Sequence, residues 1–237
     1  MTCPHCTAAT TTELSRRTQL GYRIFRCSAC DQQYHERTNS PFNDLEFPTD
    51  VVLLVVRWRM RYKLSLRDLA EVFLERGCAF THEAVREGDV RFMHRVANKL
   101  RAKRKGQAGR SWHVDETYIR VGGVWKYLSR SIARDGNLVD SLLSEHRDMD
   151  AAKRFVKAAL EVAEQTPEKV TTDEPDSYPQ AIHETLGEEV IHRCNPYLND
   201  RIEQDHRGVK HRSDPMRSFR NFATASRLSS SIGWIDV

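Results

Sequence analysis

The stretch SWHVDETYIRVGGVWKYLSRSIARDGNLVDSLL, residues 111–143, decides the fold of this chain. It contains three β-rich runs, at 112–115, 124–132 and 138–143, which are separated by Gly122-Gly123 and Asp135-Gly136. Paired glycines and Asp-Gly are typical of tight hairpin turns, because such turns need positive φ angles that glycine adopts without strain. The stretch therefore predicts three consecutive strands joined by hairpins.

The chain beyond this stretch alternates between helical and strand patterns. Residues 149–164, 178–186 and 199–211 have the apolar spacing of helices. Short apolar runs at 170–173 and 190–192 predict a fourth and a fifth strand. The order of three strands, helix, strand, helix, strand, helix indicates an α/β fold with a mixed sheet. It is the order of a ribonuclease H-like (retroviral integrase-like) domain.

Three acidic residues occupy positions in this order at which a metal could be held. Asp115 and Asp173 each end a β-rich run, and Glu203 lies within the last helical pattern. We expect Asp115 at the end of the first, central strand, Asp173 at the end of a neighbouring strand, and Glu203 on a helix across the same edge. Carboxylate oxygens are the ligands that Mg²⁺ prefers, and two metals about 4 Å apart can activate an attacking oxygen and stabilise a leaving one at a phosphodiester. The layout predicts a nuclease or polynucleotidyl transferase.

Lys210 lies two helical turns beyond Glu203, on the same predicted face. It could approach a phosphate backbone near the metals, and a solvated surface lysine explains it nearly as well.

The cysteines predict a second metal site near the N-terminus. Four of the six form two Cys-x-x-Cys pairs with 20 residues between them, which is the spacing of a structural zinc site made from two knuckles. Residues 22–26 alternate and predict a strand that leads into the second pair. Disulfides are the alternative, and they are not expected without a secretory signal. The expected zinc ligands are Cys3, Cys6, Cys27 and Cys30.

The segment between the cysteines and the strands predicts helices. Asp50 can cap a helix that runs to about residue 62, and Ser65-Leu-Arg-Asp68 resembles a capping box at the start of a second helix. Gly77 can end that helix, and Thr81 can cap a third. Two short helices joined by a glycine-containing turn in a basic context suggest a DNA-binding helix-turn-helix, although any three-helix bundle has similar helices and turns.

Charge is distributed unevenly between the two halves of the chain. Residues 1–110 hold 20 Lys and Arg against 12 Asp and Glu, and residues 111–237 hold 17 against 21. A basic N-terminal half and an acidic C-terminal half are typical of a DNA-binding part joined to a metal-binding part. The alternative is that the asymmetry arises by chance on solvated surfaces. The basic run at 99–110 could neutralise phosphates or serve as a solvated linker. We expect domains at 1–38 (zinc ribbon), 39–110 (helix-turn-helix and basic linker) and 111–237 (catalytic).

No stretch of the sequence approaches the roughly 20 apolar residues of a membrane span, and the N-terminus has no signal-peptide hydrophobic region. We therefore expect a soluble, intracellular protein.

Several motifs together carry a family resemblance. They are the segment 57–71, Asp115-Glu-Thr-Tyr118, Thr172-Asp173, and the segment 197–207 with Lys210. In these motifs the chain closely resembles DDE transposases of insertion sequences, and best the insertion-sequence-six family, including its members with an N-terminal zinc ribbon. The likeness extends from about Cys3 to about Arg220, and its specific parts are 57–71 and 199–210.

The resemblance implies a metal-binding triad of Asp115, Asp173 and Glu203, with Lys210 as the family's basic residue on the same helix. Two Mg²⁺ (or Mn²⁺) ions would serve the active site, and Zn²⁺ would be structural. The implied activity is cleavage at the element's ends followed by attack of the freed 3′-hydroxyls on target DNA. The implied partners are terminal inverted repeats, target DNA and further copies of the chain, in a homodimer or larger assembly.

Two other interpretations fit the residues. One is a non-catalytic or degenerate zinc-ribbon and helix-turn-helix DNA-binding protein, which would lack metal-dependent strand transfer. The other is a repair or resolving nuclease on the same fold, which would cut without joining.

Overall fold

The computed structural model describes residues 1–62, 64–173, 178–195, 200–213 and 219–231. Lys63 and residues 197–199, which belong to motifs of the resemblance, lie outside the described residues, as does the end of the tail from 232. The chain divides into two compact units, Met1–Val55 and Val56–Val237. In the described parts, no helix combines the length and the apolar character needed to cross a membrane.

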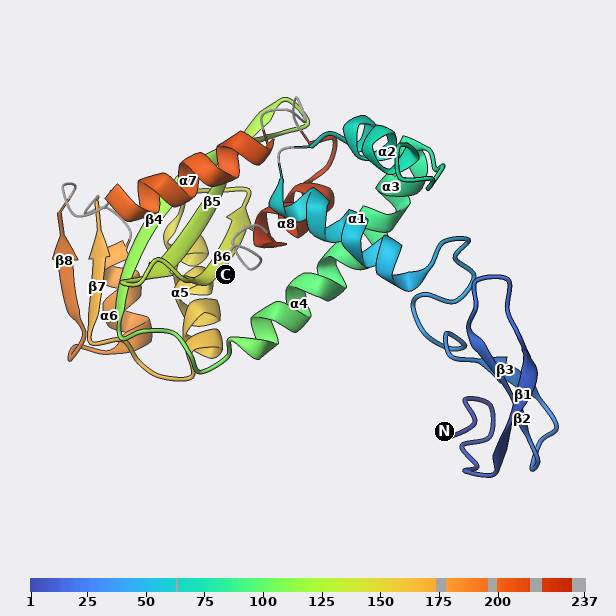
Figure 1. Ribbon diagram of the computed structural model, residues 1–237. Coiled ribbons are helices and arrows are strands. Elements are labelled where there is room, and N and C mark those ends of the chain that lie inside the picture. Colours follow the sequence, from blue (N-terminus) through green and yellow to red (C-terminus); the bar gives the residue numbers. More distant parts are fainter. Residues whose placement is uncertain (63, 174–177, 196–199, 214–218, 232–237) are drawn as a thin grey trace. The chain divides into compact units, whose positions relative to one another are not determined.

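The first unit contains a three-stranded antiparallel sheet in the order β1-β2-β3 (Figure 1). Its strands are β1 (Thr11–Arg17), β2 (Arg23–Cys27) and β3 (Gln33–His35), and β2 confirms the strand predicted at 22–26. Phe25 and Tyr34 form its small core, with ring centroids 5.5 Å apart. A sheet of this size buries little apolar surface from which to gain stability.

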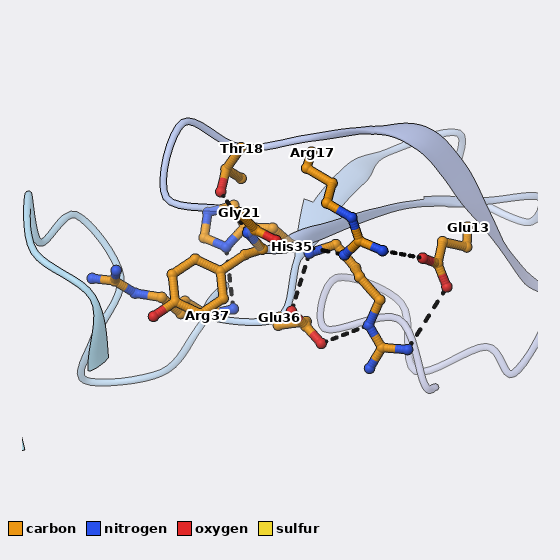
Figure 2. A network of polar contacts seen from close by, with 9 residues as sticks. Glu13, Arg17, Thr18, Gly21, His35, Glu36 and Arg37 are labelled. Carbon is orange, nitrogen blue, oxygen red and sulfur yellow. Dashed lines mark hydrogen bonds and ion pairs between the residues drawn. The ribbon is translucent and has the colours of Figure 1, made fainter. Parts of the chain in front are cut away.

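Figure 2 shows the polar contacts that join the strands at the end away from the cysteines. Arg23 donates from Nε to Glu36 at 2.7 Å and lies 3.7 Å from Glu13, which also pairs with Arg17 at 3.6 Å. These side chains are largely exposed, so each ion pair contributes little to stability on its own.

Helix α1 (Thr49–Arg61) begins one residue before the predicted cap. Asp50 lies inside its first turn, so the prediction that Asp50 caps the helix is wrong. The Tyr22 hydroxyl accepts instead from the Thr49 backbone N–H at 2.7 Å. The start of α1 is thus fixed by a side chain from the ribbon rather than by a local cap.

The next helices follow the sequence prediction closely. Helix α2 (Leu66–Leu74) begins with a complete capping box between Ser65 and Asp68, and Gly77 follows it with a φ of 78°. Thr81 caps α3 (His82–Gly88), as predicted. A π-helical turn, η1 (Asp89–Met93), and α4 (His94–Lys103) continue the same helical run. The first part of the predicted basic linker at 99–110 is therefore helical.

Buried aromatic and aliphatic side chains form the contacts between these helices. Phe73 lies at their centre, with ring centroids 5.4 Å from Trp58 and 5.5 Å from Phe80. Arg59 of α1 is buried and pairs with Asp89 at 3.1 Å, and it also donates to the Leu64 carbonyl at 2.7 Å. Helices α2 and α3 follow each other in the chain, and their role as a DNA-binding helix-turn-helix stays a prediction.

The remainder of the second unit is built on a five-stranded sheet in the order β6-β5-β4-β7-β8 (Figure 1). β4 is antiparallel to β5 and parallel to β7. The β4–β5 turn is made by Gly122 and Gly123, with φ angles of 57° and 83°, as the predicted hairpin requires. The strands are β4 (Ser111–Val121), β5 (Val124–Ala133), β6 (Leu138–Ser144), β7 (Lys169–Thr172) and β8 (Ile191–Cys194).

Helices cover both faces of this sheet (Figure 1). On one face α5 (Met149–Ala163, capped by Asp148) and α6 (Tyr178–Leu186) bury the main apolar core around Trp112 and Phe155. On the other face α7 (Asp200–Ser213) packs against β4 and β5. Its predicted first residue, Asn199, lies outside the described residues. This order of strands and helices confirms the ribonuclease H-like α/β fold.

Two features differ from the prediction. β4 continues to Val121 because its pairing with β5 persists to the hairpin, so Asp115 lies within the strand rather than at its end. A further helix, α8 (Phe222–Ser231), was not predicted, and it packs against β6, β4 and α4. Its sequence is rich in serine and has a weak apolar pattern, which explains why periodicity did not reveal it.

Candidate active site

Asp115 and Asp173 come together through the pairing of β4 with β7. The last residues paired in this parallel ladder are His113 and Thr171. Extending the register by two residues sets Asp173, which directly follows β7, opposite Asp115. In adjacent strands, residues in register project to the same face about 4.8 Å apart. The structure thus brings these two predicted site residues side by side.

The electrostatic environment of Asp115 reflects this proximity. Burial, together with the negative charge of Asp173, raises the pKa of the Asp115 carboxyl to about 7. The Asp115 side chain is 15% exposed, so water screens the repulsion only in part. Two partly buried carboxylates with this mutual repulsion fit a divalent cation, because its positive charge would stabilise both in the ionised form.

Glu203 and Lys210 are both exposed on α7. The Glu203 side chain is 55% exposed and lies 3.6 Å from Arg207, one turn later on the same helix. Among the described residues, the only group of three or more potential metal ligands within 4.8 Å of one another is formed by cysteines. The Glu203 carboxylate is therefore not gathered with Asp115 and Asp173, and its role as a third ligand stays a prediction.

His206 is a site residue that the sequence did not reveal. It is buried on α7, and its Nδ1 lies 3.3 Å from Asp115 Oδ2. Burial lowers the pKa of His206 to about 4, so the imidazole is neutral at pH 7. Its spacing three residues after Glu203 was available in the sequence, but its contact with Asp115 depends on how α7 packs.

Next to His206, Asp205 forms an ion pair that was also not predicted. Both nitrogens of the Arg130 guanidinium that face Asp205, Nε and Nη2, donate to its carboxylate. Arg130 is fully buried on β5 and lies directly opposite Asp115 in the β4–β5 register. The middle of α7 is therefore attached to the sheet beside the carboxylate pair.

A second polar network occupies the opposite face of β4. Glu116 accepts from the Tyr178 hydroxyl at 3.1 Å and pairs with Arg147 at 2.8 Å. The Ser129 hydroxyl lies 3.1 Å from the Tyr178 hydroxyl and can donate to it, and burial together with the charge of Glu116 raises the pKa of Tyr178 well above the ordinary value. This network joins β4, β5 and α6 beneath the site.

The four cysteines of the first unit lie together as predicted. Cys3 and Cys30 have sulfur atoms 3.7 Å apart, those of Cys6 and Cys27 are 3.5 Å apart, and all four lie within 4.8 Å of one another. These separations exclude disulfides, whose S–S length is about 2.05 Å. Zn–S bonds of about 2.3 Å in a tetrahedron place sulfurs roughly 3.8 Å apart. Backbone N–H donation from Cys30 lowers the pKa of Cys27 to about 7, which favours the thiolate that a metal binds. The cluster fits a tetrahedral metal ion.

Comparisons with known proteins agree with this geometry. A family model described as a DDE domain, DDE_Tnp_IS240, matches residues 109–236. The transposase for the insertion sequence-like element IS431mec of Staphylococcus aureus strain Mu50 is 33% identical over 181 residues, covering 75% of this chain and 80% of that protein. The transposase for insertion sequence element IS257 in transposon Tn4003 of Staphylococcus aureus matches with the same identity and coverage.

Among solved structures, the simian T-cell lymphotropic virus intasome in complex with the PP2A regulatory subunit B56 gamma aligns with 53% of this chain and 49% of that chain. The identity is 15% and the TM-score is 0.40.

Proposed function

This chain belongs to the DDE transposases of the insertion-sequence-six family, and from that premise we propose that it cleaves DNA at the ends of its element and joins the freed 3′-hydroxyls to target DNA. The protein is a DNA transposase with the fold of a polynucleotidyl transferase. The observation that carries the proposal of catalysis is the adjacent, partly buried pair Asp115 and Asp173, next to α7. The non-catalytic interpretation is not favoured, because the family and the carboxylate pair both point to chemistry.

The pair would hold divalent metal together with Glu203. Mg²⁺ or Mn²⁺ bound by such carboxylates supplies activation of the attacking oxygen and stabilisation of the leaving one. Asp115, Asp173 and Glu203 are the residues that would hold the ions. Rotation of the exposed Glu203 side chain away from Arg207 makes its carboxylate available for this role. Lys210, two turns along α7, would contact the DNA backbone.

The remaining parts of the chain would position DNA. The basic front half and the α2–α3 helix pair suit contact with the terminal inverted repeats. The cysteine cluster would hold Zn²⁺ and thereby stabilise the ribbon. Because two element ends must be joined, we expect a homodimer or larger assembly on DNA, acting in the cytoplasm of a bacterial cell.

A strand-transfer assay tests the proposal directly. Purified protein, Mg²⁺, a labelled duplex carrying the end of the flanking element and a target plasmid should give products joined at the 3′ end of the label. Glu203→Gln should abolish these products. Glu184→Gln, a matched change on α6 at an exposed side chain that pairs with Lys153, should retain them. Cutting without joining would favour a nuclease, and binding without either would favour a DNA-binding protein that has lost catalysis.

A further inference from the structure

Two consecutive residues of helix α7 attach it to the sheet by contacting residues on two neighbouring strands. Asp205 binds the buried Arg130 of β5, and His206 contacts Asp115 of β4. Arg130 and Asp115 lie opposite each other in the β4–β5 ladder, on the same face. Consecutive residues of α7 therefore bind a cross-strand pair, which fixes both the rotation and the height of the helix above the carboxylates.

His206 is an unusual residue for a packing position. Its neighbours along the buried stripe of α7 are Ile202 and Val209, both fully buried and apolar. Its Nε2 is buried and has no hydrogen-bond partner among the described residues. A buried polar atom without a partner costs free energy that an apolar side chain of similar size would not. The imidazole makes one polar contact that an apolar side chain could not make, because its Nδ1 lies 3.3 Å from Asp115 Oδ2.

We propose that His206 is a positioning residue for catalysis: its Nδ1–H donates to Asp115 Oδ2 and, together with the Glu116 backbone N–H that donates to Oδ1 at 2.6 Å, fixes the orientation of the Asp115 carboxylate. The inference rests on the proposed function. Glu203 lies one helical turn before His206, so the same contact also holds the part of α7 that carries Glu203. A metal ligand whose orientation is fixed by a second hydrogen bond binds its ion more tightly.

Two amide substitutions separate this role from packing. An asparagine carries its amide nitrogen close to the place of Nδ1, whereas a glutamine carries it close to the place of Nε2. His206→Asn therefore keeps the donor to Asp115, His206→Gln moves it away, and His206→Leu removes it while filling the space. A purely structural role predicts that Leu is the best tolerated of the three, because it also removes the unpartnered nitrogen.

The first measurement is the affinity of the full-length, zinc-loaded protein for Mn²⁺ in the absence of DNA. Calorimetry or electron paramagnetic resonance measures this affinity. We expect His206→Leu and His206→Gln to weaken Mn²⁺ binding by about 10- to 100-fold, the range found for such outer ligand partners. His206→Asn should stay within about threefold of the wild type. His183→Leu, which removes an exposed histidine on α6, should have no effect. Equal losses for Asn and Gln, or unchanged binding for a folded Leu variant, would overturn the proposal.

The second measurement is strand transfer as a function of Mg²⁺ concentration. His206→Gln should need more Mg²⁺ and should lose about 10- to 100-fold in rate, whereas its melting temperature should match that of His206→Asn. If the His206→Leu variant does not fold, the comparison of His206→Asn with His206→Gln still tests the proposal. Absence of strand transfer in the wild type would contradict the proposed function, and the Mn²⁺ titration would then test His206 separately.

Discussion

Replacing Asp115 with asparagine should abolish strand transfer and, at the same time, stabilise the metal-free protein at pH 8. The side chain is mostly buried, next to Asp173, and its pKa is raised to about 7 from an ordinary value of 3.8. His206 is neutral at this pH, because burial lowers its pKa to about 4, so it cannot balance the charge of Asp115. Asparagine has nearly the same shape and removes the repulsion.

The sign and size of the effect follow from the two pKa values. Because the folded protein holds the proton to higher pH than the unfolded chain, ionisation of Asp115 costs stability as pH rises from about 4 to about 7, and the full cost is present above that. Each pH unit corresponds to about 1.4 kcal/mol, which gives an upper limit of about 4 kcal/mol. Local relaxation reduces this, so we expect about 2 kcal/mol, or about 4–8 °C in melting temperature for a unit of this size.

The assay is thermal or urea unfolding at pH 4 and at pH 8, in buffer made metal-free by dialysis rather than by a chelator that would strip the cysteine cluster. Asp115→Asn should melt higher than the wild type at pH 8, and the difference should shrink toward zero near pH 4. Millimolar Mg²⁺ should stabilise the wild type and not the variant. Asp150→Asn, an exposed change in the first turn of α5, should shift stability by less than about 0.5 kcal/mol. A variant less stable than the wild type at pH 8 would refute the reasoning.

Three further predictions concern other parts of the fold. Asp205→Ala should destabilise the protein by about 3–5 kcal/mol in urea unfolding, because it removes the carboxylate that balances the charge of the fully buried Arg130; a loss below about 1 kcal/mol would contradict this. Gly88→Ala should stabilise by up to about 1 kcal/mol, since Gly88 has helical dihedrals and an added Cβ meets no atom within 4 Å; lower stability would show a contact not seen here. Cys27→Ser should reduce the zinc content measured by atomic absorption from about one ion per chain toward none, whereas Cys78→Ser should leave it unchanged.

The sequence predicted the features that depend on a few neighbouring residues. The capping box at Ser65, the cap at Thr81, the glycine turn after β4 and the bounds of α6 all agree with the structure. Each is set by backbone hydrogen bonds or φ angles within one turn of the chain, so the residue types suffice. The spacing of the cysteines likewise predicted their cluster.

Asp115 and Asp173 were also found from the sequence, because each follows or ends an apolar β run and the strand order places those runs side by side. Where the prediction was wrong, distant contacts decided the outcome. Asp115 is internal to β4 because pairing with β5 extends the strand, and α1 begins at Thr49 because Tyr22 of the ribbon accepts its first N–H.

Only the tertiary structure revealed how α7 is held over the carboxylates. Arg130 and Asp205 are 75 residues apart, and His206 reaches Asp115 from the other end of the domain's sequence. Nothing local distinguishes these residues from other charged side chains on an amphipathic helix. Their partners are chosen by the register of β4 with β5 and by the rotation of α7, and both depend on the packing of the whole core rather than on any short segment.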